Sequence, residues 1–140
     1  MNTYQHELMT RMAVTLRRDV GPKVTDEYAR TQAFMAAVVL EKLSNELLLV
    51  PEHAQLDRRD ADALFTAIAA LLSAADVPDA LSTALAEGPT SADPAAALSR
   101  LVEALYAAHD ALGEAVFETA RARVRTTLRA RIDRQLEYSA

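Results

Sequence analysis

The sequence predicts an all-α fold, an up-and-down bundle of five main helices plus one short helix, in a single domain over residues 1–140. Three observations support this prediction. Hydrophobic residues make up 51% of the chain but aromatic residues only 5%, and the abundant Ala and Leu with three Gly favour helices over strands. Apolar residues recur at steps of three and four, and no strand-like alternation occurs. Short connections make successive helices roughly antiparallel.

The first predicted helix spans residues 3–20. Glycine followed by proline at Gly21-Pro22 indicates its end, because Gly can adopt the left-handed conformation and Pro cannot continue a helix. One side of the helix is apolar and steps by four, which predicts the face that packs against a neighbour. The residues on this side are Tyr4, Leu8, Met12 and Leu16.

The second predicted helix, residues 25–50, contains no Gly or Pro, begins with Thr25 as a possible cap, and is closed by Pro51. It carries a broad apolar stripe at helical spacing. The large residues of the stripe are Tyr28, Met35, Val38, Val39, Leu43, Leu47 and Val50. We therefore expect this helix to be the central post of the bundle, covered on at least three sides by other helices. The covering helices would be residues 3–20, 58–75 and 114–138.

The third predicted helix follows a loop at residues 52–56 and a capping Asp57. Its periodicity is the cleanest in the chain, and every step is a three or a four. The residues of its apolar face are Ala61, Leu64, Phe65, Ile68, Leu71, Leu72 and Ala75. A short helix is predicted over residues 79–87, ended by Gly88-Pro89.

The fifth predicted helix begins at Asp93-Pro94, where a capping Asp precedes Pro at the first helical position. We expect a break at Gly113, because one helix over residues 94–138 would be unusually long; a continuous kinked helix is the alternative. The last helix, residues 114–138, would then bury one further apolar stripe. Its members are Phe117, Ala120, Val124, Leu128, Ile132 and Leu136.

Composition narrows the classes of function. The absence of Cys removes disulfides, thiolate nucleophiles and Cys-ligated metal sites. The amino terminus has no basic segment followed by an apolar core, and the apolar runs are too short to span a bilayer, so we expect a cytoplasmic protein without a membrane segment. The net charge of −5 argues against a general affinity for nucleic acid.

The histidines do not form a recognisable metal site. A di-iron or di-manganese bundle needs Glu-x-x-His on two helices, whereas Thr3, Val50 and Tyr106 precede the three histidines by three positions. The pair His109-Asp110 is similar to the HD pair of metal-dependent phosphohydrolases, but the further ligands cannot be assigned. The simpler interpretation is a histidine at a helix end beside an ordinary acidic residue, and no cofactor is expected.

Other catalytic patterns are absent as well. No Gly-x-Ser-x-Gly occurs, and the serines lie in no strand–turn–helix context. Three glycines in helix-ending contexts cannot build a loop that binds phosphate. Glu41 and Glu46 are five residues apart, which does not place them as a carboxylate pair. The sequence therefore predicts no catalytic residue and no enzyme.

The strongest deviation from a neutral pattern is the basic last helix, where residues 115–140 carry six Arg against three acidic residues. Such a helix can bind phosphates or an acidic partner. The simpler interpretation is a solvated face, or pairing with acidic residues of the same chain. If the helix binds a partner, we expect an acidic protein surface, a phosphate-bearing small molecule or a second copy of the chain. The predicted interaction surface consists of Arg121, Arg125, Arg129, Arg131 and Arg134.

Besides the histidines and the arginines, the methionines suggest a possible ligand site. Met9, Met12 and Met35, with Tyr4 and Tyr28, would line a ligand pocket between the first two helices, or else fill gaps in the core.

One stretch, residues 6–47, carries a family resemblance. Its first helix ends in Val20-Gly21-Pro22, and a long Ala-rich helix follows that ends in Glu46-Leu47. In these elements it resembles the opening of small all-helical bacterial proteins of unknown function, associated with aminoglycoside-phosphotransferase-like kinases and acyl-CoA dehydrogenases. The resemblance implies an accessory protein and transfers no catalytic residue.

An enzyme that uses His109 and Asp110 would need a metal bound in stoichiometric amount, and two further hypotheses of function are preferred to it. The first is a non-enzymatic helical accessory or interaction protein, a homodimer or the partner of an acidic protein surface, with the basic last helix at a contact. The second is a helical bundle that binds an acyl or phosphorylated small molecule in an apolar gap near Met12 and Met35, with an arginine at its mouth.

Overall fold

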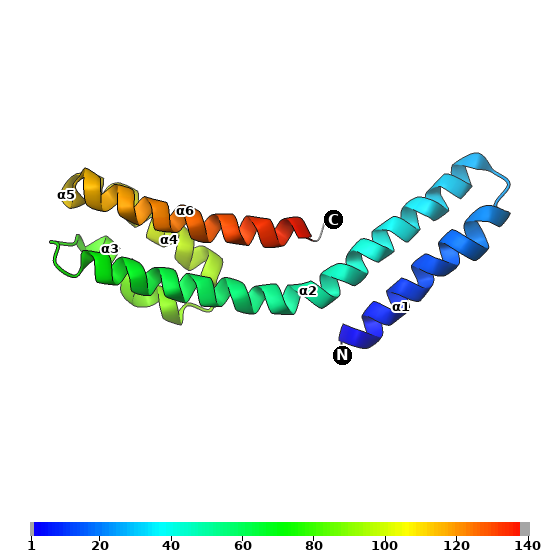
Figure 1. The fold of residues 1–140 in the computed structure, drawn as a ribbon, viewed down its shortest axis with the longest axis horizontal. Helices are drawn as coiled ribbons and strands as arrows, with labels where there is room; N and C mark the ends of the chain where they lie inside the picture. The colour runs from blue at the N-terminus through cyan, green and yellow to red at the C-terminus, as the bar shows by residue number, and fades with distance from the viewer. Residues whose placement is uncertain (1, 138–140) are drawn as a thin grey trace. The chain divides into compact units, whose positions relative to one another are not determined.

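The computed structural model describes residues 2–137, and these are helical except for short connections (Figure 1). The predicted all-α class is confirmed, since the described residues form six α-helices and no strand. A π-helical turn, Leu16–Val20, and a 3₁₀ turn, Gly21–Lys23, extend the first helix, and a second 3₁₀ turn, Gly88–Thr90, follows the third. The helices are α1 (Asn2–Thr15), α2 (Glu27–Leu72), α3 (Asp79–Glu87), α4 (Pro94–Ala107), α5 (His109–Leu112) and α6 (Glu114–Glu137).

Helix α2 is the main departure from the sequence prediction. It continues through Pro51, so the predicted helix end there, the loop at residues 52–56 and the cap at Asp57 are wrong. Proline lacks the N–H that would bond to the carbonyl four residues back, which costs about 3 kcal/mol in a helix interior. Pro51 is exposed, and the flanking segments are rich in Ala, Leu and Glu, so helix on both sides outweighs one lost hydrogen bond.

The described residues group into two compact units, residues 2–54 with 134–137 and residues 55–133. In the first unit, α1 and the first part of α2 form an antiparallel hairpin (Figure 1). The hairpin buries small side chains along its seam, namely Ala13, Ala37 and Ser44. Small residues let two helix backbones approach closely. The single domain expected over residues 1–140 stays a prediction.

Polar contacts fix the register of the hairpin. Ser44 is only 1% exposed, and its hydroxyl lies 2.6 Å from Nδ1 of His6 and 2.8 Å from the hydroxyl of Thr10. Further along, both Nη atoms of Arg17 donate to the two carboxylate oxygens of Glu41 at 2.8 Å. A bidentate guanidinium–carboxylate pair permits few geometries, so these contacts specify how the two helices align.

The expectation that residues 25–50 form a covered central post is wrong. Residues 58–72 belong to the same helix, so they cannot pack against it. Val39 and Leu43 in the expected core are 51% and 41% exposed, and Tyr4 of α1 is 73% exposed. Three large residues of the predicted stripe, Tyr28, Met35 and Val39, are more than half exposed, and the buried residues of α2 in the hairpin are Ala37 and Ser44 instead.

Two local predictions near the hairpin turn also change. The side chain of Asp26, and not that of Thr25, accepts a hydrogen bond from the backbone N–H of Ala29 at 2.7 Å, at the start of α2. Gly21 has a right-handed conformation. Its role is close packing, because a Cβ there would lie 2.8 Å from Phe34.

The second unit contains the large core. Helix α2 contributes the stripe that the sequence identified in residues 61–72, and α3, α4, α5 and α6 pack around it. Leu81 of α3 and Leu101 of α4 are fully buried. At the carboxyl end of α6, however, Ile132 and Leu136 are 51% and 60% exposed, contrary to expectation. The predicted residue 138 lies outside the described residues.

The predicted cap at Asp93 and the predicted break at Gly113 are both present, and the chain has a further break between them. Asp93 caps α4 by accepting from the N–H groups of Ala95 and Ala96 at 3.0 and 3.1 Å. The break at Gly113 is confirmed; its φ of 79° is a conformation that glycine adopts without strain. The continuous kinked alternative is therefore wrong. The chain also breaks at Ala108, which separates the single-turn helix α5 from α4.

The continuity of α2 predicts the effect of replacing its proline. Pro51→Ala restores a backbone donor in a helix interior, so we expect the free energy of unfolding to rise, by up to about 3 kcal/mol. Urea denaturation followed by circular dichroism measures this change. Pro22→Ala is the matched control, because Pro22 lies in a 3₁₀ turn and is compatible with its place there. A destabilising effect of Pro51→Ala would contradict a continuous helix.

Candidate functional site

The first unit has exposed apolar side chains on both helices of the hairpin. Along α2, apolar residues repeat in alternating steps of four and three, which is the spacing of a helix that packs against others in a coiled-coil manner. The residues are Ala29, Ala33, Ala36, Leu40, Leu43, Leu47 and Val50. At about 1.5 Å per residue, this stripe runs for about 32 Å.

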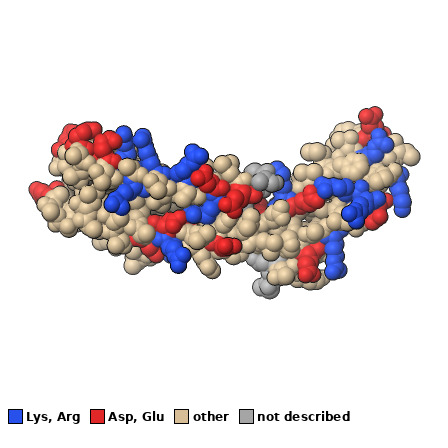
Figure 2. Space-filling model, viewed as in Figure 1, with Lys and Arg blue, Asp and Glu red and all other residues tan. Residues whose placement is uncertain are grey.

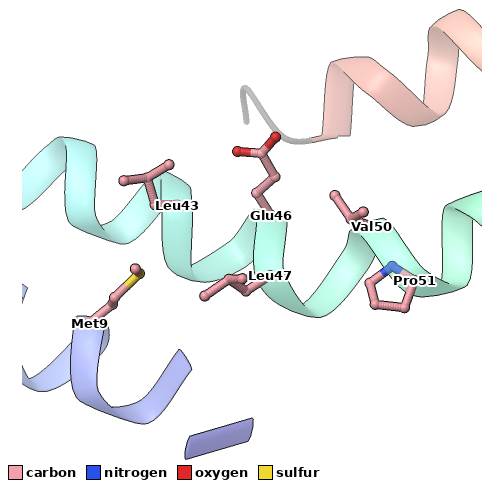
Figure 3. Close-up of a pocket in the computed structure, with 6 residues that line it drawn as sticks. All are labelled: Met9, Leu43, Glu46, Leu47, Val50 and Pro51. Carbon is pink, nitrogen blue, oxygen red and sulfur yellow. The ribbon is translucent and has the colours of Figure 1, made fainter. Parts of the chain in front are cut away.

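Helix α1 adds a second row beside the first. Met9 of α1 and Leu43, Leu47, Val50 and Pro51 of α2 line one open groove of about 300 Å³. Figure 3 shows the Met9 side chain directed toward Leu43 and Leu47. The groove therefore joins apolar residues of both helices on one side of the hairpin.

Leu8 and Met12 neighbour Met9 on α1, one residue before it and one turn after it, and they are 47% and 48% exposed. We call the α2 stripe together with Leu8, Met9 and Met12 the hairpin face. Isolated exposed apolar residues are ordinary, whereas apolar residues of two helices that line one groove form a candidate interaction surface.

The predicted methionine pocket is only partly reflected here. Met9 lines the groove, but Met12 and Met35 are about half exposed, and Glu46 rather than an arginine stands at the groove. The groove is open to solvent along its length, so it is better suited to a helix than to an enclosed small molecule.

The two helices of the hairpin carry opposite net charge. Residues 1–24 contain four basic and two acidic residues, giving +2, whereas residues 25–50 contain two basic and four acidic residues, giving −2. Within the hairpin this difference is expressed in the Arg17–Glu41 ion pair. A second molecule with the same charges would be complementary to the hairpin if its basic helix packed against the acidic helix and its acidic helix against the basic one.

The predicted basic surface on α6 is divided among different contacts. Arg121 pairs with Glu118 at 2.6 Å, Arg129 with Asp133 at 3.0 Å, and Arg131 with Asp57 at 3.7 Å. Figure 2 shows blue and red side chains interspersed where Figure 1 places α6.

The other two predicted arginines differ from each other. Arg134 belongs to the first unit and has an interaction of its own. Arg125 makes no ion pair with any described residue. Arg121 and Arg125 line the same pocket, between α4 and α6.

The histidines occupy three different settings. His6 is part of the hairpin seam, and His53 is buried, with its Nε2 3.2 Å from Oε2 of Glu137. Within residues 2–137, no group of three His, Asp or Glu side chains is arranged to hold a metal ion.

His109 lies where α4, α5 and α6 meet. Its Nδ1 is 3.0 Å from Oδ1 of Asp110, and its Nε2 is 2.9 Å from Oε2 of Glu114. The imidazole also packs edge-on against Phe117, with ring centroids 4.5 Å apart. The hydrogen bond to Asp110, followed by that to Glu114, raises the pKa of His109 above its ordinary value of 6.5. Protonated His109 therefore bridges two carboxylates at this corner.

Comparison with protein-family models, with curated proteins and with solved structures finds no match to this chain. None of the helices in residues 2–137 combines the length and the apolar character that a membrane span requires.

His109 predicts a pH dependence of stability. Because its pKa is raised in the folded state, its stabilising contribution is fully present below about 6.5 and is lost as pH rises through the folded value. We expect the melting temperature to fall slightly from about pH 6 to pH 8, and His109→Gln to flatten this slope. Thermal melts of both proteins across this range test it. An identical slope in wild type and His109→Gln would contradict the assignment.

Proposed function

We propose that this chain is a non-enzymatic helical interaction protein that acts as a homodimer, with the hairpin face as the contact between the two copies. The observation that carries the proposal is the apolar surface of the hairpin. A buried serine lies at the seam between its helices, while leucine, valine and methionine side chains lie outside.

Burial of the hairpin face would supply stability that the hairpin lacks. Two helices with small residues at their seam bury little apolar area, and units of this size gain stability by oligomerisation or other means. Each leucine or methionine removed from water contributes up to about 1.5–3 kcal/mol when fully buried. The exposed parts of Leu8, Met12, Leu43 and Val50 are therefore available to stabilise a complex.

A second copy suits the hairpin face better than an unrelated partner for two reasons. The alternating spacing of four and three along α2 matches the packing of antiparallel four-helix bundles, which two hairpins would form. A twofold axis places α1 of one copy against α2 of the other, so that the basic helix meets the acidic one on both sides. Self-complementarity of shape and charge is what an isologous contact requires.

The arginines of α6 are not part of the proposed contact between the two copies. Arg121, Arg129 and Arg131 already have acidic neighbours in the chain, which weakens a role in binding a further acidic surface. A contact with an acidic partner protein through Arg125 remains compatible with the homodimer. We propose no nucleic-acid partner, because the acidic chain would be repelled by phosphates.

The homodimer is tested by placing a charge in the hairpin face. Leu43→Glu would put an unpaired carboxylate at the contact in both copies, so we expect the dissociation constant of the dimer to rise about 100-fold or more. Ala36→Glu is a second variant, because Ala36 is exposed and its replacement removes no packing from the hairpin. Analytical ultracentrifugation measures the oligomeric state, and circular dichroism verifies that each variant remains helical.

The matched control is Val38→Glu. Val38 is 37% exposed, similar to the 41% of Leu43, but it lies five residues away and hence about 140° around the same helix. We expect Val38→Glu to leave the dimer intact. A wild-type chain that is monomeric at tens of micromolar, or equal effects of Val38→Glu and Leu43→Glu, would overturn the proposal.

A further inference from the structure

A second site lies in the other unit, in a pocket of about 210 Å³ between α4 and α6. Its wall is apolar and includes the aromatic side chains of Tyr106 and Phe117. Aliphatic side chains from both helices complete the wall, namely Val102, Leu105, Val124 and Leu128. The residues that line the pocket all belong to the second unit.

Two arginines, Arg121 and Arg125, also line this pocket, one helical turn apart on α6. No acidic side chain lines it, so the positive charge at the pocket is not balanced within its wall. Arg125 is exposed and makes no ion pair with any described residue. An apolar wall beside the guanidinium of Arg125, which no acidic side chain among the described residues pairs, is complementary to a molecule with an apolar body and an anionic end.

The geometry of Arg121 supports the same interpretation. One of its terminal nitrogens donates to Glu118 outside the pocket, and its guanidinium lies 6.0 Å from the centre of the Phe117 ring. Its Nε is buried without a hydrogen-bond partner among the described atoms. Glu118 and Phe117 therefore hold Arg121 in position at the pocket without satisfying all of its donors.

We propose that this pocket binds a small amphipathic carboxylate, with the chain or ring against Tyr106 and Phe117 and the carboxylate on Arg125 and Arg121. The volume sets the size of the ligand. Pockets for drug-sized ligands measure roughly 300–1,000 Å³, so this pocket takes a smaller molecule, such as a medium-chain fatty acid or a substituted benzoate. A guanidinium matches a carboxylate in charge and in planar geometry, which favours a carboxylate over a neutral or cationic head group.

The test uses the full chain and octanoate as the probe, measured by isothermal titration calorimetry. Octan-1-ol and octylamine are the matched probes, with the same chain and a neutral or cationic end. We expect octanoate to bind at least about tenfold more tightly than octanol, since a hydrogen bond to a charged group contributes about a factor of ten or more. Absence of octanoate binding, or equal affinity for octanoate and octanol, would overturn the proposal.

Variants locate the site. Arg125→Gln should weaken octanoate about tenfold and leave octanol unchanged, and its folding is not at risk because Arg125 is exposed and unpaired. Arg123→Gln is the control, since Arg123 lies on the same helix but lines a different surface hollow. An equal loss in Arg123→Gln and Arg125→Gln would show a general charge effect and contradict the site. Leu43→Glu should bind octanoate as the wild type does, which separates this proposal from the homodimer.

Discussion

Helix α2 runs unbroken from Glu27 to Leu72, and the two parts of one helix cannot pack against each other. Each part of α2 must therefore bury its apolar side chains against other helices. In the first unit, α1 packs along the seam of α2, and His53 of α2 contacts Glu137 of α6; in the second unit, α3, α4, α5 and α6 pack around α2. An apolar stripe that continues along both parts is therefore covered well in one and incompletely in the other.

The hairpin illustrates how the choice of seam residues determines the surface. Ala13, Ala37 and Ser44 occupy the line of closest approach, and small side chains there leave the larger ones on the flanks. The His6–Ser44–Thr10 hydrogen bonds specify the register, because a shift along the helix would leave a buried hydroxyl without partners. The small side chains at the seam thus have two effects: they allow the specific polar contacts between α1 and α2, and they leave the larger apolar side chains exposed on the flanks. The proposed pairing with a second copy would bury these exposed side chains.

In the second unit, Phe117 connects several features that are separate in the sequence. Its ring contacts Tyr106 and His109 edge-on and lies below the guanidinium of Arg121. The break at Gly113 allows this arrangement, because it reverses the chain between α5 and α6 and brings α6 back along α4. Phe117 consequently contacts both His109, which bridges two carboxylates, and Arg121, which lines the pocket.

The sequence by itself determined the helical class, the capped start of α4, the break at Gly113 and the core stripe of residues 61–72, because these depend on local propensity and periodicity. Periodicity shows which side of a helix is apolar, but not what covers it. Only the tertiary structure decided that α2 passes through Pro51, that Leu43 and Val50 stay exposed, and that Arg121 and Arg125 meet Tyr106 across two helices. The exposure of Leu43 and Val50 and the pocket depend on contacts between residues far apart in the chain, where no local rule applies. At Pro51, two local rules oppose each other, and the helix propensity of the flanking segments outweighs the lost hydrogen bond.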